Sequence, residues 1–119
     1  MKIIIFITIC LVFISCTRQV CPGTINVNRN MFKRYLIILN QSKHPRKLVF
    51  PKEVDEAIGF LEIVSGINSK AELDNIRVYK NKNDFRNDIK QWEEWYKENK
   101  CKLTIQYVDS AFKSVGLKY

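Results

Sequence analysis

The sequence contains few of the residues on which enzymes and metal proteins usually depend. His44 is the only histidine, and the four glycines are dispersed along the chain. Dispersed glycines exclude a glycine-rich loop that cradles phosphate groups. A mechanism based on His44 would need a nucleophile and an orienting acid beside it, and nothing in the sequence indicates that such groups converge there. We therefore interpret His44 as an ordinary loop residue.

A hydrophobic run long enough to cross a bilayer is also missing. The longest apolar stretch covers residues 3–14 and is interrupted only by Thr8. A membrane-spanning helix needs about 20 apolar residues, so this stretch is too short for a permanent span. Its length, and Lys2 before it, are typical of the hydrophobic region of a signal peptide.

The apolar run ends in Phe13-Ile14-Ser15-Cys16. This ending resembles the lipobox of bacterial lipoproteins, in which a small residue precedes an invariant cysteine. The resemblance covers the first 16 residues. It implies that a diacylglyceryl group is attached to the Cys16 thiol and that signal peptidase II removes residues 1–15. Phe13 departs from the leucine usual at its position, and an uncleaved anchor or an ordinary secretory signal is the alternative.

Lipid on Cys16 implies a membrane-anchored protein of the cell envelope whose first partner is membrane lipid. Each buried methylene contributes about 0.8 kcal/mol, and stable anchoring needs more than one acyl chain. Thr17 is not the aspartate that retains many lipoproteins at the inner membrane, which favours an outer membrane where the cell has one. Residues 16–28 form the lipidated N-terminus and a tether with a turn at Pro22-Gly23. We expect the domain behind this short tether to lie close to the membrane.

The cysteines have different expected fates after export. Cys10 leaves with the signal peptide and Cys16 takes lipid, so Cys21 and Cys101 remain. In an oxidising compartment these two can form a disulfide, and the sequence equally allows unpaired reduced thiols. Two cysteines and one histidine are fewer than the four ligands of a structural zinc site. We expect no metal and no other cofactor.

The chain is basic, with 20 lysines and arginines against 12 acidic residues, a net charge of +8. Such a balance suggests anionic partners, for example lipid headgroups or acidic glycans. Scattered lysines are nevertheless better explained by a solvated basic surface. Because the basic residues do not alternate with exposed aromatic residues, and because the chain is expected to be exported, we expect no nucleic-acid partner.

Residues 29–119 are long enough for one domain. Apolar residues recur at helical spacing in three segments of this domain. The predicted helices cover about residues 30–40, 51–65 and 84–99. Pro51 suits a first helical turn and Gly66 a helix end, while Asp84 is the expected cap of the third helix. The run 35–39 also fits a buried strand, and 41–47 is expected to be a loop.

Two other segments are less regular. Ser69-Lys70-Ala71-Glu72 matches a capping box and predicts a short helix, after which residues 76–79 are extended. Alternating apolar residues over 103–107 predict a short strand that pairs with 76–79, or else an irregular approach to a last helix capped by Asp109 and ended by Gly116. The expected fold class is therefore mainly α, a single small domain of four or five helices with a possible two-stranded β patch. An α+β fold is the alternative.

The most notable side-chain cluster is aromatic. Trp92 and Tyr96 share the apolar face of the third predicted helix, so we interpret them as core residues. Trp95 lies toward the edge of that face and is the predicted partner contact. The motif Trp-x-x-Trp-Tyr-x-x-Asn-Lys is similar to one in small bacterial lipoproteins, and this similarity implies no particular activity.

Paired carboxylates are the remaining catalytic candidates. Glu93 and Glu94 are adjacent, as are Asp55 and Glu56, so on a helix each pair points about 100° apart. A glycosidase instead needs two carboxylates facing each other across a sugar. We expect no enzymatic activity and a lipid-anchored interaction domain that binds an envelope protein or polymer. The alternative is an inhibitor or immunity protein against an envelope toxin or hydrolase. A wall or glycan hydrolase is less favoured, because it requires a pocket with convergent polar groups.

Overall fold

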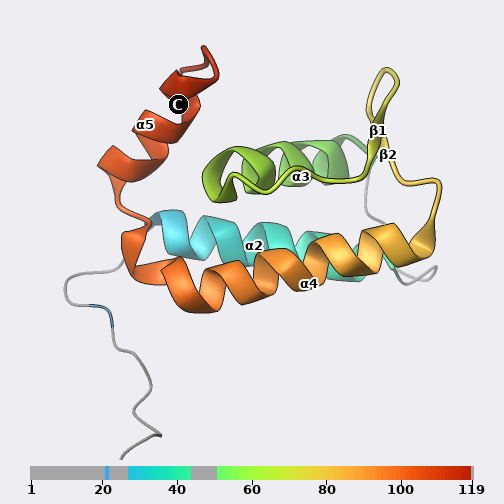
Figure 1. The fold of residues 1–119 in the computed structure, drawn as a ribbon, viewed down its shortest axis with the longest axis horizontal. Helices are drawn as coiled ribbons and strands as arrows, with labels where there is room; N and C mark the ends of the chain where they lie inside the picture. The colour runs from blue at the N-terminus through green and yellow to red at the C-terminus, as the bar shows by residue number, and fades with distance from the viewer. Residues whose placement is uncertain (1–20, 22–26, 44–50, 119) are drawn as a thin grey trace, which may run out of the picture.

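The computed structural model describes residue 21, residues 27–43 and residues 51–118 (Figure 1). These residues form one small, mainly helical domain with a two-stranded antiparallel sheet, as the sequence predicts. Cys16, the predicted signal peptide with Cys10, the predicted turn at Pro22-Gly23 and His44 lie outside the described residues. Of the helices within these ranges, none combines the length and the apolar character that crossing a membrane requires.

Helix α2 spans Val27–Ser42. It begins before the predicted start and overlaps the end of the expected tether, 16–28. It also continues through Gln41 and Ser42, which were expected in the loop. The Ser42 hydroxyl donates a 2.7 Å hydrogen bond to the Leu39 carbonyl, and this bond satisfies one of the acceptors that a helix end leaves without a partner. The strand alternative for 35–39 is wrong.

Helix α3 spans Pro51–Ser65 and matches its prediction. Proline is suited to the first turn because its missing N–H would have no partner there. Glu53 places negative charge near the positive end of the helix dipole. Gly66 adopts a φ of 72° and its N–H donates to the Glu62 carbonyl at 2.9 Å, which ends the helix.

A β-hairpin follows α3, where a short helix was predicted. Strand β1 (Glu72–Leu73) pairs with strand β2 (Arg77–Val78) in antiparallel register, Glu72 opposite Val78 and Leu73 opposite Arg77. Of the segment 76–79 that was predicted to be extended, Arg77 and Val78 form a strand, and their partner is β1 and not 103–107.

The capping-box interpretation fails because tertiary contacts use its polar groups. The Ser69 hydroxyl donates to the Glu62 carboxylate at 2.7 Å instead of accepting a helical N–H. The Lys70 N–H donates to the Asp88 carboxylate at 2.7 Å. The Glu72 carboxylate pairs with Lys80 at 2.6 Å. A segment whose hydrogen bonds run to two neighbouring helices does not need its own helical turn.

Helix α4 spans Lys82–Asn99 and is followed by a 3₁₀ turn, η2 (Lys100–Lys102). The predicted cap, Asp84, is wrong by one turn. Asn81 caps the helix, and its side-chain oxygen accepts the Asn83 N–H at 2.8 Å. Asp84 lies in the first turn, where its charge suits the helix dipole.

Helix α5 spans Ile105–Ser114, so the strand predicted over 103–107 is wrong. Thr104 caps the helix and accepts the Tyr107 N–H at 3.1 Å. Leu103 is fully buried whereas Ile105 is 70% exposed, which a half-buried strand would not allow. Asp109, the predicted cap, lies inside the helix and pairs with Lys113 at 2.8 Å.

Helices α2 and α4 lie side by side, and α3 lies alongside α2 (Figure 1). The hairpin stands at the end where α4 begins, and α5 rises from the end where α4 finishes. The core between these elements is apolar. It consists of Phe32, Leu36, Leu39, Ala57, Ile58, Phe60, Leu61, Val64, Ile89, Trp92, Leu103 and Val108.

A disulfide joins Cys21 to Cys101 in η2, with the two Cα atoms 5.1 Å apart. It closes a loop between cysteines separated by 80 positions, which is most of the domain. Of the two alternatives that the sequence leaves open, the structure contains the bonded form. The bond places Cys21 at the end of the domain where α4 finishes.

Candidate functional site

The aromatic residues of α4 lie mainly in the core. Trp92 is fully buried. The Trp95 ring stacks on Phe32 at 5.3 Å between centroids, and the Tyr96 ring stacks on the same phenylalanine at 5.4 Å. Phe32 covers one face of the Trp95 ring, and Trp95 as a whole is half-buried. Contact between its remaining surface and a partner stays a prediction.

The hairpin is fastened to α3 through Arg77. Its guanidinium pairs with Asp55 at 3.0 Å and with Glu62 at 3.3 Å, and its backbone N–H also donates to Asp55 at 2.9 Å. A Cβ at Gly59 would lie 3.2 Å from this guanidinium, so the glycine lets Arg77 lie close against the helix. Because one cation lies between two carboxylates on one helix face, this network has a structural role.

A second polar contact fastens the hairpin to α4. Asp88 is 1% exposed and accepts hydrogen bonds from the Lys70 N–H and the Tyr79 hydroxyl, each at 2.7 Å. The pKa of Tyr79 is raised above its ordinary value, first because burial disfavours the phenolate. Asp88 raises this pKa further, because it accepts a hydrogen bond from the neutral phenol and its negative charge would repel a phenolate. Tyr79 is therefore held in its neutral, donating form.

We predict that this contact makes stability depend on alkaline pH. Because the folded-state pKa of Tyr79 exceeds the unfolded value near 10, its contribution is complete below pH 10 and is lost as the pH rises above it. Between pH 9 and pH 11 the native chain should lose about 1 kcal/mol more unfolding free energy than Tyr79→Phe, as measured by urea titration. Lysine titration affects both proteins equally, so equal losses would contradict the prediction.

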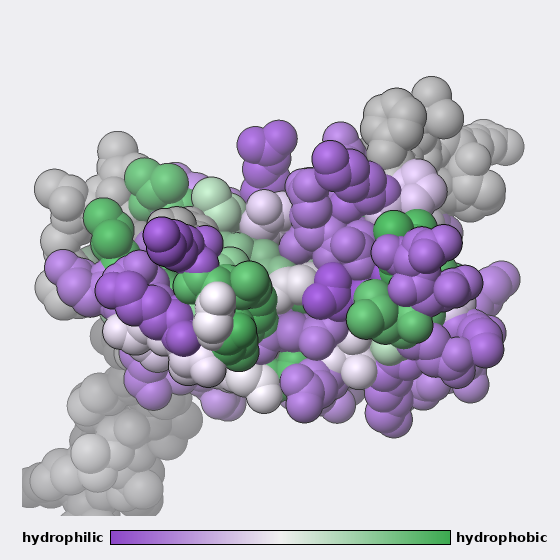
Figure 2. All heavy atoms as spheres, turned by 90° about the horizontal axis from the view of Figure 1, so that it is seen from above, coloured by the Kyte–Doolittle hydropathy of each residue, from purple (hydrophilic) through white to green (hydrophobic). Residues whose placement is uncertain are grey.

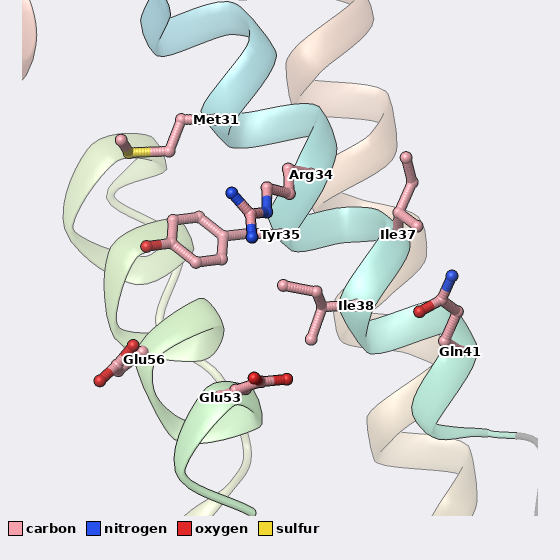
Figure 3. A pocket seen from close by; sticks show the side chains of 8 residues that line it. All are labelled: Met31, Arg34, Tyr35, Ile37, Ile38, Gln41, Glu53 and Glu56. Carbon is pink, nitrogen blue, oxygen red and sulfur yellow. The ribbon is translucent and has the colours of Figure 1, made fainter. Parts of the chain in front are cut away.

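A groove with a volume of about 490 Å³ lies between α2 and α3. We call it the α2–α3 groove. Figure 3 shows Tyr35 and Ile38 pointing from α2 toward α3, with Glu53 and Glu56 along the facing side of α3. Its lining comprises Met31, Arg34, Tyr35, Ile37, Ile38, Gln41, Glu53 and Glu56.

The charge of this groove differs from that of the whole chain. Glu53 and Glu56 are exposed, and neither forms an ion pair with another described residue. Arg34 is the one basic residue among the described residues of the lining, where two carboxylates face one guanidinium, although the whole chain has a net charge of +8. The groove therefore combines apolar side chains with a local excess of negative charge.

A second hollow of about 420 Å³ continues the groove toward α5. The two share Met31, Tyr35 and Glu56. The rings of Tyr35, Phe60 and Phe112 line this continuation. The centroid of the Phe60 ring lies 4.9 Å from that of Tyr35 and 6.0 Å from that of Phe112. Seen from above, apolar areas lie among hydrophilic surface (Figure 2). The two hollows offer a long, partly aromatic surface with acidic side chains beside it.

The carboxylate pairs from the sequence do not converge in the structure. Asp55 binds Arg77, whereas Glu93 on α4 accepts a 3.2 Å hydrogen bond from the Asn40 amide of α2. Among the described residues, no three histidine, cysteine, aspartate or glutamate side chains are grouped so that they would hold a metal ion.

Sequence reasoning missed the residues that line the groove. Tyr35 and Glu53 fall within the predicted helices 30–40 and 51–65, and sequence reasoning gave neither of them a binding role. Helical periodicity shows which face of each helix is apolar but not which helices become neighbours. Ile37 lines the groove and is 54% exposed, so α2 has more apolar surface than its core contacts need.

Comparison of the whole chain with protein-family models, with curated proteins and with solved structures finds no significant match.

Proposed function

We propose that the protein is a lipid-anchored, non-enzymatic binding domain of the bacterial cell envelope, whose partner occupies the α2–α3 groove. The proposed location at the cell envelope rests on residues 3–16, which resemble a signal peptide with a lipobox. The Cys21–Cys101 disulfide supports this location, because such bonds persist mainly in proteins exported from the reducing cytoplasm.

The observation that carries the binding proposal is the composition of the groove. Apolar side chains such as Tyr35 and Ile38 offer surface that gains free energy when a partner removes it from water. Glu53 and Glu56 add a charge that selects partners with basic side chains. The partner that fits is a protein segment carrying an apolar residue beside lysine or arginine. An acidic glycan is disfavoured, because it would meet the two carboxylates.

The test is capture of partners by the native lipidated protein with the groove charge reversed. We expect Glu53→Lys with Glu56→Lys to reduce recovery of the partner at least about tenfold, because each lost charge contact at an interface costs on the order of 1 kcal/mol or more. Captured proteins would be quantified by mass spectrometry after mild chemical crosslinking.

The matched control reverses two exposed glutamates of α4, Glu94→Lys with Glu98→Lys, which changes the net charge equally outside the groove. Proteins lost with the groove variant and kept with this control are the groove's partners. A single toxin or hydrolase held in stoichiometric amount would favour the inhibitor function. If the two variants capture the same proteins in the same amounts, the groove is not the binding site.

A further inference from the structure

The tether that carries the proposed lipid is joined to one defined end of the domain. Helix α2 begins there, α4 finishes there and α5 starts there (Figure 1). Phe32, near the start of α2, stacks on Trp95 and Tyr96, near the end of α4, which places both helix ends together. The disulfide between Cys21 and Cys101 joins the tether to the same end.

The disulfide shortens the distance that the tether can span. From Cys16 to Cys21 an extended chain reaches at most about 18 Å. Without the bond, the chain from Cys16 to Val27 would reach about 40 Å. The Cα atom of Cys101 lies only 5.1 Å beyond that of Cys21. A lipid on Cys16 therefore keeps this end of the domain, and not the hairpin at the far end of α4, close to the membrane surface.

The surface at this end is apolar and basic. We define the tether face as Val27, Lys97, Lys100, Lys102 and Ile105. Val27 is 65% exposed and Ile105 is 70% exposed, although both are large apolar residues. The three lysines follow one another at the end of α4 and in η2, and none forms an ion pair with another described residue.

The charge of this segment is not balanced locally. Glu98 is the only acidic residue between Lys97 and Lys102, so three lysines outweigh one carboxylate. Lysines near an anionic lipid surface are attracted to it, and exposed apolar side chains enter its interfacial region. The attraction decays within about a Debye length, roughly 8–10 Å, so it acts only on a surface that the tether keeps close.

We propose that the tether face docks on an anionic lipid surface, so that the domain rests against the membrane with the hairpin directed away from it. This inference rests on the proposed lipid anchor at Cys16. The docking holds one orientation and leaves the α2–α3 groove, on the sides of α2 and α3, open to a partner.

The test is lysine labelling of the mature lipidated protein in vesicles. A membrane-impermeant acetylating reagent is applied to protein in phosphatidylcholine vesicles with and without phosphatidylglycerol, and each lysine is quantified by mass spectrometry. Labelling of Lys100 and Lys102 should fall about fivefold in the anionic vesicles, the factor by which one lysine contact favours the surface. Exposed Lys82 and Lys90, elsewhere on α4, should be unchanged. High salt should abolish the difference.

Variants at exposed positions separate docking from folding. Lys102→Glu with Ile105→Ser should remove the protection of Lys100. Lys90→Glu with Leu73→Ser, which changes an equally exposed apolar residue of the hairpin, should keep it. Replacing Cys21 and Cys101 by serine lengthens the tether and should weaken the protection. Equal labelling of Lys100 in both vesicle types would overturn the proposal. Protection that follows protein density in neutral vesicles would also overturn it, by assigning the face to a second copy.

The intact mass of the same sample reports the lipid, so the two proposals fail separately. If no lipid is present, the anchor proposal fails, and the same labelling is done on the purified chain mixed with the vesicles. Protection of Lys100 and Lys102 there would support the docking face without the anchor. Uniform labelling would overturn the docking face as well.

Discussion

Replacing Phe32 by alanine is expected to lower the free energy of unfolding by about 3–5 kcal/mol. Phe32 is fully buried and lies between helices, with Phe60 of α3 at 6.4 Å and the stacked rings of Trp95 and Tyr96 on α4. The substitution removes ring contacts to both helices and leaves a cavity where α2, α3 and α4 meet. Urea unfolding followed by tryptophan fluorescence measures the loss.

The matched control is Ile37→Ala in the same helix. Ile37 is 54% exposed, so its truncation should change the unfolding free energy by less than about 0.5 kcal/mol. Phe32→Leu keeps more of the volume and should fall between the two variants. If Phe32→Ala costs no more than Ile37→Ala, the described packing of α2 against α3 and α4 is wrong.

Removing the disulfide is expected to lower the unfolding free energy by about 4 kcal/mol. Cys21 and Cys101 are separated by 80 positions, and a crosslink over so long a loop restricts the unfolded chain strongly. The variant with serine at both positions should show this loss in urea unfolding. The tertiary contacts of the helices remain, so the far-ultraviolet circular dichroism spectrum of the folded state should change little.

Chemical reduction supplies the control for the cysteine variant. Dithiothreitol should lower the stability of the native chain to that of the double serine variant and leave the variant itself unaffected. Cys16 carries lipid under the proposed function and does not contribute. A native chain whose stability does not respond to the reductant would contradict the bond between Cys21 and Cys101.

The parts of the fold that sequence reasoning predicted correctly are those fixed by local chemistry. Pro51 and Gly66 mark the ends of α3 because one suits a first turn and the other a positive φ. The burial of Ile89 and Trp92 follows from their spacing on one helix face. Such features depend on neighbours within a few positions, which the sequence contains in full.

Two of the wrong predictions concern segments whose structure depends on packing against other elements. Ser69 matched a cap by spacing, but its hydroxyl binds Glu62 of α3. The alternation around Leu103 and Ile105 fits a strand, and it also fits a buried residue before a helix cap followed by an exposed one. A short run of alternating residues cannot distinguish these cases without the packing.

The candidate site shows the same limit more strongly. The α2–α3 groove depends on Tyr35 and Glu53, which come from different helices and face each other only once α2 and α3 pack. The tether face depends on a disulfide whose formation the sequence left open. Each residue type was visible beforehand, whereas the surfaces they form require the arrangement of the helices.

The intact mass of the protein purified from bacterial membranes tests the lipid-anchored account most directly. The account predicts a chain that begins at Cys16, lacks residues 1–15 and carries the added mass of a diacylglyceryl group, with further acylation adding one more chain. Fragmentation should place this mass on Cys16, and Cys16→Ala should remove both the lipid and the cleavage. A native chain that retains residues 1–15, or that begins at another residue without lipid, would contradict the account.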